Sequence, residues 1–478
     1  MNGLGAMLRH EFRMLLADRI VWVVAAAILL LTGYSVQVGA AAADDQRTQV
    51  EQAADEERER YAGLRETMTS VHQGELSPSP FQDPTRPYVM GRARGQRYAV
   101  LPVNSFQATA VGQSDLIPPV VPVLLDGADP RGAREEIENP VHLLAGPLDL
   151  AFLITFLLPL LALAVSFDLL SREREQGTLA LLLSQPVSAR RIVAGKLLVR
   201  WGLLMGLVAV ATLLSLLLFA TGVAWQPFLF WGVIVALYLG FWIGLAALVN
   251  ATGRESARNA VALAFLWLVF VIVIPAGVQI SAVFLHPVPS RAELVALERE
   301  EVRQVQEEAS AVLAQYYDDH PELLPEGSVD EVDFQTRAFA VNQEVQARLR
   351  PVRQNHREAL RAQQDWIRAL RWLSPTLVTH EALIELAGTG DARFGAFEEG
   401  VDRFHREWVG FFEPRIYTDS RLAPEDLDRL PVWTFEERSS GAAHAAAPGI
   451  LGLLLFSALV LGISMRFLTD GGDRRWTP

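Results

Sequence analysis

The sequence predicts an all-α polytopic membrane protein with six transmembrane helices and both termini in the cytoplasm. A mainly helical extracytoplasmic domain is expected from two insertions, with short strands allowed in the first. Two observations carry this prediction. The 478 residues are 51% hydrophobic, and the apolar residues gather in six long runs. The formal net charge of -13 is divided unevenly along the chain.

Six segments are long and apolar enough to cross about 30 Å of hydrocarbon, which takes about 20 residues in a helix. None has a charged residue in its middle, as expected from the cost of burying charge in a membrane. The predicted spans are 20–38, 150–167, 201–220, 228–249, 260–285 and 447–467.

The positive residues of the short connections give the orientation, because such residues are retained in the cytoplasm. With six spans, every arginine-rich connection falls on one side, and the uncharged loop 221–227 falls on the other. We therefore expect a bacterial cytoplasmic membrane protein with both termini inside. The residues behind this expectation are Arg9, Arg13, Arg19, Arg172, Arg174, Arg190, Arg191, Lys196, Arg200, Arg254, Arg258, Arg466, Arg474 and Arg475.

The first span has an alternative interpretation as a cleaved signal peptide with a mature start near Asp44. Glu11 and Asp18 precede the apolar run and argue against it. The stretch from Leu8 to Leu16 instead resembles an amphipathic helix at the membrane interface.

The acidic residues lie in the two insertions. Residues 44–146 have a net charge of -6 and residues 286–445 of -12, whereas the rest of the chain has +5. This division excludes a single soluble domain, a nucleic-acid binder with a basic surface and a disordered chain. The absence of cysteine excludes disulfide scaffolds, iron–sulfur clusters and thiolate zinc sites.

The first insertion is predicted to contain one helix over 49–70, followed by loops with short strands near Tyr98–Val103 and Val120–Leu125. In the second, apolar spacing predicts an amphipathic helix over 291–317 and a further helix over 337–372, interrupted or kinked at Pro351. Ser374 and Pro375 form a helix start, and Gly388 is a plausible stop.

A stripe of aromatic side chains marks one more helix in the second insertion. These residues step by three and four positions, which places them on one face. Core packing or contact with a partner helix is favoured over a ligand cage. The candidates for partner contact are Phe394, Phe397, Phe404 and Trp408.

The sequence supports no catalytic, cofactor or metal site in this chain. The nine histidines form no zinc-hydrolase pattern, and the serine-hydrolase elbow is absent. Gly195-Lys196 is followed by Leu197 rather than Ser or Thr, so the phosphate-binding loop fails. An enzyme with an exterior active site is therefore poorly supported, and any ATP must be hydrolysed by another subunit.

The connection 168–200 differs from the other loops. A charged helical end that breaks at Gly177, a short apolar helix before Pro186 and a third helix from Ala189 would form a compact knob below the membrane. Such a knob suits docking into a groove on a soluble partner. The alternative is a helix that lies on the lipid surface.

This connection resembles the coupling-helix region of permease subunits of type 2 ATP-binding-cassette (ABC) transporters. The resemblance rests on Glu175-Gln176-Gly177-Thr178-Leu179, on Leu182-Leu183-Ser184-Gln185-Pro186-Val187-Ser188 and on Gly195-Lys196. Arg9-His10-Glu11-Phe12-Arg13 resembles the amphipathic elbow helix of that family, which gives elbow candidates Arg9, Glu11, Phe12 and Arg13.

The resemblance implies that two permeases pair, as a homodimer or with a related permease, and that each docks on an ABC ATPase subunit carrying ATP and Mg. In that arrangement Glu173 and Glu175 meet the polar rim of the ATPase, Gly177 sets the turn, and the leucines fill its groove. The candidate ATPase-coupling residues are Arg172, Glu173, Glu175, Gly177, Thr178, Leu179, Leu182 and Leu183.

The two large insertions depart from many members of the family. A branch with such insertions is linked to multi-copper enzyme maturation, and Trp372-Leu373-Ser374-Pro375 with Leu386-Ala387-Gly388-Thr389-Gly390 is similar to it. No Met- or His-rich copper motif supports that role here. The expected divisions are 1–19 elbow helix, 20–43 first span and exit, 44–146 first insertion, 147–167 second span, 168–200 coupling region, 201–285 spans three to five, 286–445 second insertion, and 446–478 sixth span and tail.

The function that this resemblance implies is the permease subunit of an ATP-driven exporter whose substrate is unknown. The alternative is a mechanotransmission or scaffold protein whose exterior domain binds an envelope partner without moving a substrate. Beyond the ATPase and a second permease copy, the expected partner is the lipid bilayer, with no nucleic acid.

Overall fold

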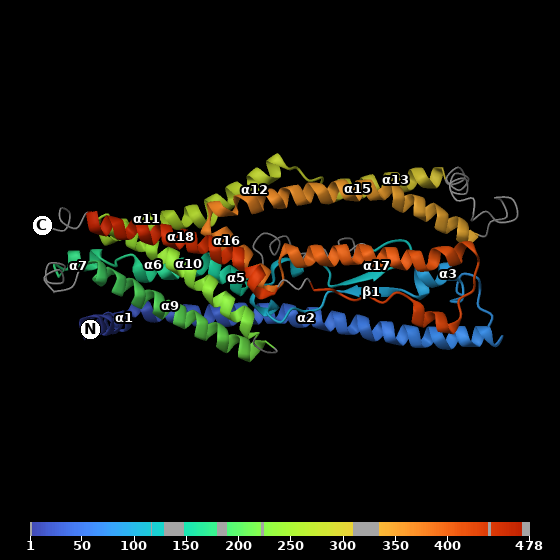
Figure 1. The fold of residues 1–478 in the computed structure, drawn as a ribbon, viewed down its shortest axis with the longest axis horizontal. Coiled ribbons are helices and arrows are strands. Elements are labelled where there is room, and N and C mark those ends of the chain that lie inside the picture. Colours follow the sequence, from blue (N-terminus) through green and yellow to red (C-terminus); the bar gives the residue numbers. More distant parts are fainter. Residues whose placement is uncertain are drawn as a thin grey trace.

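The protein is elongated and has two parts that lie end to end (Figure 1). One part is a bundle of membrane-spanning helices, and the other, which we call the insertion domain, is formed by the two insertions. The first helix and the end of the last helix lie at the same end of the bundle, which we call the terminal face (Figure 1). The computed structural model describes residues 2–115, 117–128, 148–178, 189–220, 224–308, 334–437 and 441–470.

Among the described residues, six helical segments are long and apolar enough to cross a membrane, as the sequence predicts. By length and composition they are Arg19–His72, Leu150–Glu175, Arg191–Phe219, Trp225–Ala251, Ser256–Leu285 and Ala442–Phe467. The second is made of α5 (Leu150–Phe152), the π-helix η4 (Leu153–Leu157), α6 (Leu158–Ser166) and α7 (Ser171–Glu175). The third, fourth and sixth lie in α9 (Ala189–Phe219), α10 (Trp225–Ala251) and α18 (Ala442–Asp470), and the fifth is made of α11 (Ser256–Leu268), the π-helix η5 (Val269–Val273) and α12 (Ile274–Leu285).

The first span continues without a break into the insertion domain. The helix α1 (Asn2–Ala17) ends at Asp18, whose carboxylate accepts the backbone N–H of Ile20 and caps α2 (Arg19–His72). The 54 residues of α2 extend over about 80 Å at 1.5 Å per residue. The helix predicted over 49–70 is confirmed, but it is continuous with the first span, because the Ala-rich stretch after Gly39 favours helix and joins the two pieces.

The remainder of the first insertion packs along the outer half of α2. Its two short strands, β1 (Arg97–Val100) and β2 (Val120–Val123), pair antiparallel with Arg97 opposite Val123, which confirms the predicted strand regions. A side chain at Gly39 would overlap the carbonyl of Ala108, so α2 and this insertion meet at backbone distance. The other short elements are α3 (Pro87–Val89), the π-helix η1 (Met90–Arg94), η2 (Gln107–Thr109) and η3 (Gly112–Asp115).

The second insertion is helical, as predicted. Ser290 caps α13 (Arg291–Glu307) with a capping box, and the predicted extension of this helix to 317 lies outside the described residues. Pro351 lies inside the continuous helix α15 (Phe334–Leu370). Ser374 and Gly388, the latter in the left-handed region with φ +74°, bound α16 (Pro375–Ala387), as the sequence indicates. The remaining elements are η8 (Arg371–Leu373), α17 (Asp391–Tyr417) and η9 (Pro424–Arg429).

The aromatic stripe of α17 fills the core of the insertion domain. Phe394, Phe397, Phe404 and Trp408 are all 3% exposed or less, and they pack with residues of both insertions. The indole N–H of Trp408 donates to the carbonyl of Gly91 at 3.0 Å. Their assignment as partner-contact candidates is therefore wrong, because the first insertion of the same chain already covers this face.

Helix α16 differs from its predicted place in an exterior block. Val378, Ala382, Leu383 and Leu386 are buried in the core of the membrane bundle, beside α10 and α18. The helix therefore re-enters the bundle from the insertion domain, because its apolar face needs cover that α10 and α18 supply.

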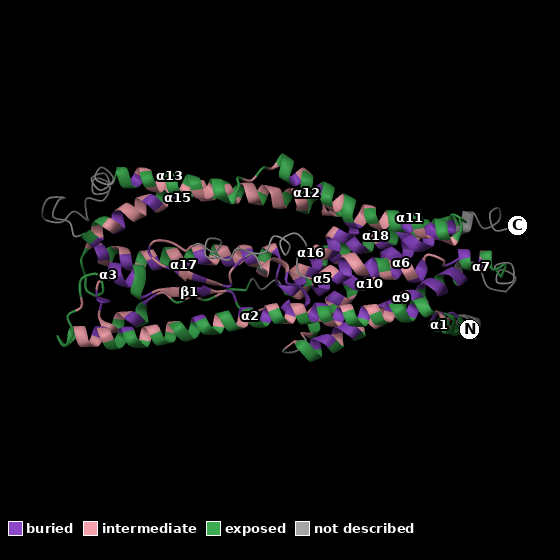
Figure 2. Ribbon diagram, turned by 180° about the vertical axis from the view of Figure 1, so that it is seen from behind, coloured by how far each residue is buried: buried purple, intermediate pink, exposed green. Residues whose placement is uncertain are grey.

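The core of the bundle is centred on α10, where buried residues are concentrated (Figure 2). A side chain at Gly244 would lie 3.1 Å from Leu461 of α18, so the small-residue face formed by Gly240 and Gly244 packs within the chain. Gly202 and Gly206 have no described neighbour within 4 Å.

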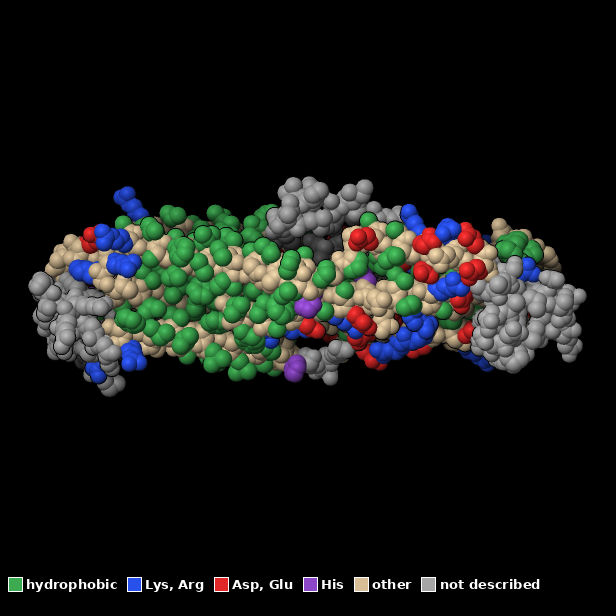
Figure 3. Space-filling view, turned by 90° about the horizontal axis from the view of Figure 1, so that it is seen from above, with side chains coloured by type: hydrophobic (Ala, Val, Ile, Leu, Met, Phe, Trp, Pro, Cys, Tyr) green, Lys and Arg blue, Asp and Glu red, His purple; other side chains and the backbone are tan. Residues whose placement is uncertain are grey.

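The surface agrees with a membrane bundle beside a charged domain. Hydrophobic side chains cover the visible face of the bundle, and charged side chains gather over the insertion domain and at the terminal face (Figure 3).

Candidate functional site

Four segments meet at the terminal face: α1, α7, the start of α9 and the turn between α10 and α11 (Figure 1). Helix α7 has only five residues and ends at Gly177, whose φ is +71°. The N–H of Gly177 donates to the carbonyl of Arg174 at 3.1 Å, and that of Thr178 to the carbonyl of Glu173 at 2.9 Å. These two bonds form a Schellman motif, and the predicted break at Gly177 is confirmed.

Two acidic and two basic side chains are buried together between three of these helices. We call Glu11 of α1, Glu173 of α7, and Lys196 and Arg200 of α9 the buried ion-pair cluster; their exposed fractions are 6%, 8%, 4% and 6%. Arg200 pairs with Glu11 and Lys196 pairs with Glu173, while the Lys196 ammonium also lies 3.4 Å from Glu11. Two charges of each sign make the cluster neutral, which is the condition under which buried ions are tolerated.

The buried position of Glu11 between two cations changes the pKa of its carboxyl group. Burial raises the pKa of Glu11, but the charges and hydrogen bonds of Arg200 and Lys196 outweigh that effect, so its pKa lies below the ordinary value. Glu11 is therefore held as a carboxylate by α9. The elbow helix is thus fastened to the third span by charge as well as by the apolar side chain of Leu15.

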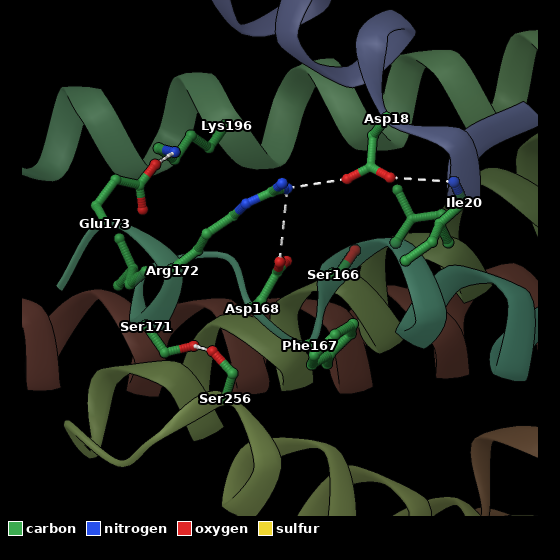
Figure 4. A network of polar contacts seen from close by, with 12 residues as sticks. Asp18, Ile20, Ser166, Phe167, Asp168, Ser171, Arg172, Glu173, Lys196 and Ser256 are labelled. Atoms are coloured by element: carbon green, nitrogen blue, oxygen red, sulfur yellow. Dashed lines mark hydrogen bonds and ion pairs between the residues drawn. The ribbon is translucent and has the colours of Figure 1, made fainter. Parts of the chain in front are cut away.

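A second set of charges joins α7 to the corner between α1 and α2. The guanidinium of Arg172 lies 2.9 Å from the carboxylate of Asp18 and 3.8 Å from that of Asp168 (Figure 4). The backbone N–H of Ile20 and then the Arg172 guanidinium lower the pKa of Asp18. Asp18 therefore caps α2 and binds α7 with the same carboxylate.

An amide hub, formed by Asn250 and Asn259, fastens α7 to the fourth and fifth spans. The side-chain N–H groups of Asn250 donate to the carbonyls of Phe167 and Ala246, both at 2.9 Å, and its oxygen accepts Leu170 N–H at 3.2 Å and Asn259 at 3.2 Å. The hydroxyls of Ser171 and Ser256 lie 2.8 Å apart (Figure 4). Sequence reasoning missed this hub, although an amide at the end of an apolar span was a signal for it.

The candidate coupling residues Arg172, Glu173, Glu175, Gly177 and Thr178 lie in α7 and the turn that follows it. The expectation that Glu173 meets the rim of a partner is wrong, because Lys196 buries it. Glu175 is exposed and accepts the backbone N–H of Ser256 at 2.7 Å. The candidates Leu179, Leu182 and Leu183 lie outside the described residues.

Helix α1 has two faces. Arg9, Phe12 and Arg13 are exposed, whereas Glu11 and Leu15 are buried against the bundle. An exposed phenylalanine between arginines fits a helix that lies at a membrane interface. Of the four elbow candidates, Glu11 alone belongs to the buried ion-pair cluster.

Within the described part of the chain, no group of three or more acidic or histidine side chains is placed to hold a metal ion. The contacts of the terminal face fasten three helices and a turn into one unit.

Comparison with known proteins relates this architecture to membrane transport. Residues 6–471 match the family model described as ABC-2 family transporter protein. The chain is 36% identical over 134 residues to the probable ABC transporter permease protein NosY of Stutzerimonas stutzeri. That alignment covers 26% of this chain and 48% of NosY, so the chain spans about half the length of this curated relative.

Proposed function

The chain belongs to the ABC-2 family of transporter proteins, and from this premise we propose that it is the permease subunit of an ATP-driven exporter. The terminal face would lie in the cytoplasm of a bacterium, where its arginines belong under the positive-inside rule. ATP and Mg would be bound by a separate ATPase subunit, since the Gly195-Lys196 pair of this chain lacks the residues of a phosphate-binding loop. A second permease copy would complete the transporter.

The observation that carries this proposal is the buried ion-pair cluster. It joins α7 to both α1 and α9, so a displacement of α7 must move the elbow helix and the third span with it. The amide hub extends the same unit to the fourth and fifth spans. Glu175, Gly177 and Thr178 remain exposed at its edge, where a soluble subunit can reach them.

We expect Glu175→Arg combined with Gly177→Pro to uncouple ATP hydrolysis from this subunit without unfolding it. The arginine reverses an exposed charge, and proline, whose φ is about -65°, cannot adopt the +71° of Gly177. The measurement is ATP hydrolysis by the detergent-purified complex, together with the amount of ATPase subunit, identified by mass spectrometry, that co-purifies. We expect a loss of tenfold or more in both.

The matched control is Glu66→Arg, which reverses an exposed charge on the outer half of α2 in the insertion domain. It should leave hydrolysis and co-purification unchanged. Full hydrolysis and full recovery of the ATPase in the Glu175→Arg, Gly177→Pro protein would remove the terminal face from the coupling mechanism.

One observation favours a second candidate function, mechanotransmission to an envelope partner. Helix α2 is a continuous rod whose two ends are both fastened, by Asp18 to Arg172 at the terminal face and by Arg65 to Asp428 at 2.5 Å in the insertion domain. A displacement at the terminal face would then be carried to the insertion domain with or without a transported substrate.

This candidate predicts a nucleotide-dependent movement of the insertion domain that requires an unbroken α2. The chain has no cysteine, so spin labels can be placed at Ala62→Cys on outer α2 and Trp225→Cys at the start of α10. In the complete complex, ATP should shift the distance between the labels, and Ala41→Pro should abolish the shift because proline interrupts the helix. Ala41→Leu is the control. If ATP does not change the distance between the labels in the protein without a substitution at Ala41, mechanotransmission is excluded.

A further inference from the structure

The re-entrant helix α16 closes the membrane bundle at the end that faces the insertion domain. Its Ala382 and Val378 pack against Gly449 and Gly452 of α18, positions at which an added side chain would collide with α16 or with Trp372. Its first turn reaches the middle of α10, where Thr376 lies 3.1 Å from the hydroxyl of Tyr238. The helix is therefore a plug made of sequence that belongs to the second insertion.

The two spans beside this first turn each contain a proline and a π-helical turn. In the second span Leu158 N–H donates to Leu153, and in the fifth Ile274 N–H donates to Val269, each five residues back. Pro159 and Pro275 follow directly and have no N–H to donate. Backbone carbonyls one turn earlier are thereby left without a helical partner in an apolar environment, where an unpaired carbonyl is costly.

Two hydroxyl groups, one at the start of α16 and one on α10, satisfy a carbonyl in each of these spans. The Ser374 hydroxyl donates to the carbonyl of Phe270 at 2.6 Å. The Tyr238 hydroxyl donates to the carbonyl of Thr155 at 2.8 Å and, with its proton used, accepts the hydroxyl of Thr376. Thr155 is the carbonyl that the missing N–H of Pro159 would bind in an α-helix, and Phe270 is released because Ile274 donates to Val269 instead and Pro275 has no N–H to replace it.

We propose that Ser374, Thr376 and Tyr238 form a latch that holds α16 as a plug between the second, fourth and fifth spans. Release of the latch lets α16 withdraw toward the insertion domain and opens the bundle on that side. The two π-helical turns provide the flexible points, since such turns interrupt the regular helix. The freed carbonyls then need water as a donor, so opening and hydration of the bundle occur together.

The test uses an impermeant charged thiol reagent on the full-length, cysteine-free chain in membrane vesicles, with no ATPase or nucleotide present. Leu383→Cys reports on the buried face of α16, and Ala62→Cys on exposed α2 reports on access of the reagent. Tyr238→Phe removes only the latch hydroxyl and should accelerate labelling at position 383 about tenfold, as expected for loss of a buried hydrogen bond. Tyr34→Phe, on an exposed face of α2, is the matched control and should change nothing.

Ser374→Ala is the second variant, and it should also accelerate labelling at position 383. It removes a helix cap as well as the latch bond, so Ser290→Ala, which removes the cap of α13 alone, is its control. If size-exclusion chromatography shows that Tyr238→Phe does not fold, labelling of Ser374→Ala provides the test. Unchanged labelling in folded latch variants, or equal acceleration by either control, would overturn the proposal. Because no ATPase is present, this outcome is independent of the coupling role proposed for the terminal face.

Discussion

Replacing Lys196 with methionine should destabilise the protein by about 3–5 kcal/mol, the range measured when one partner of a buried ion pair is removed. Lys196 contacts both Glu173 and Glu11, and all four members of the buried ion-pair cluster are at most 8% exposed. Its loss leaves two carboxylates with one cation in a site that excludes water. The measurement is the free energy of unfolding, or the shift in melting temperature, of the detergent-purified protein.

A double variant tests whether the balance of charges in the cluster explains this loss of stability. The double variant Lys196→Met, Glu173→Gln removes one charge of each sign and should recover most of the stability lost by the single variant. Arg191→Met removes an exposed charge from the same helix and should change stability by less than about 0.5 kcal/mol. If the double variant is no more stable than Lys196→Met, the neutrality of the cluster is not what permits its burial.

Replacing Trp408 with alanine should destabilise the insertion domain by about 3–5 kcal/mol, because a fully buried tryptophan leaves a large cavity. Its ring centroid lies 5.0 Å from that of Phe412, and its N–H satisfies the carbonyl of Gly91 in the first insertion. The variant therefore loses packing between the two insertions and one of the two hydrogen bonds to that carbonyl, which also accepts the backbone N–H of Leu125 at 3.1 Å. Hydrogen exchange of α17 and the adjacent strands measures the effect.

The outcome distinguishes a core residue from a binding residue. Val432→Ala, at a side chain that is 62% exposed in the same domain, is the control and should have a small effect. A Trp408→Ala protein with unchanged exchange in α17 would mean that this side chain does not hold the two insertions together, and it would restore partner contact as its role.

Local features of this fold could be predicted because each depends on neighbouring residues. The six spans follow from runs of apolar residues, and Ser374, Pro375 and Gly388 mark α16 through capping chemistry that involves only a few positions. Gly177 marks the end of α7 for the same reason. In each case the interaction that stabilises the element lies within one or two turns of the chain.

The predictions that were wrong depend instead on contacts between residues far apart in the chain. The aromatic stripe of α17 predicts a face that must be covered, but periodicity does not say whether the same chain or another covers it. Glu173 is an acidic residue in a charged loop, and nothing local shows that Lys196 will bury it. Glu11 and Arg200 are paired across 189 positions, so their contact exists only once α1 lies against α9.

The sequence alone therefore predicts six spans and two acidic insertions, because hydropathy and charge act locally, and its short motifs carry the resemblance to type 2 ABC permeases. The tertiary fold decides which surfaces remain exposed and available to a partner. Burial of a side chain depends on every helix that approaches it, and the approach of α1 to α9, of the first insertion to α17, and of α16 to α10 and α18 joins segments far apart in the chain. The buried ion-pair cluster, the amide hub and the latch all arise from those long-range contacts.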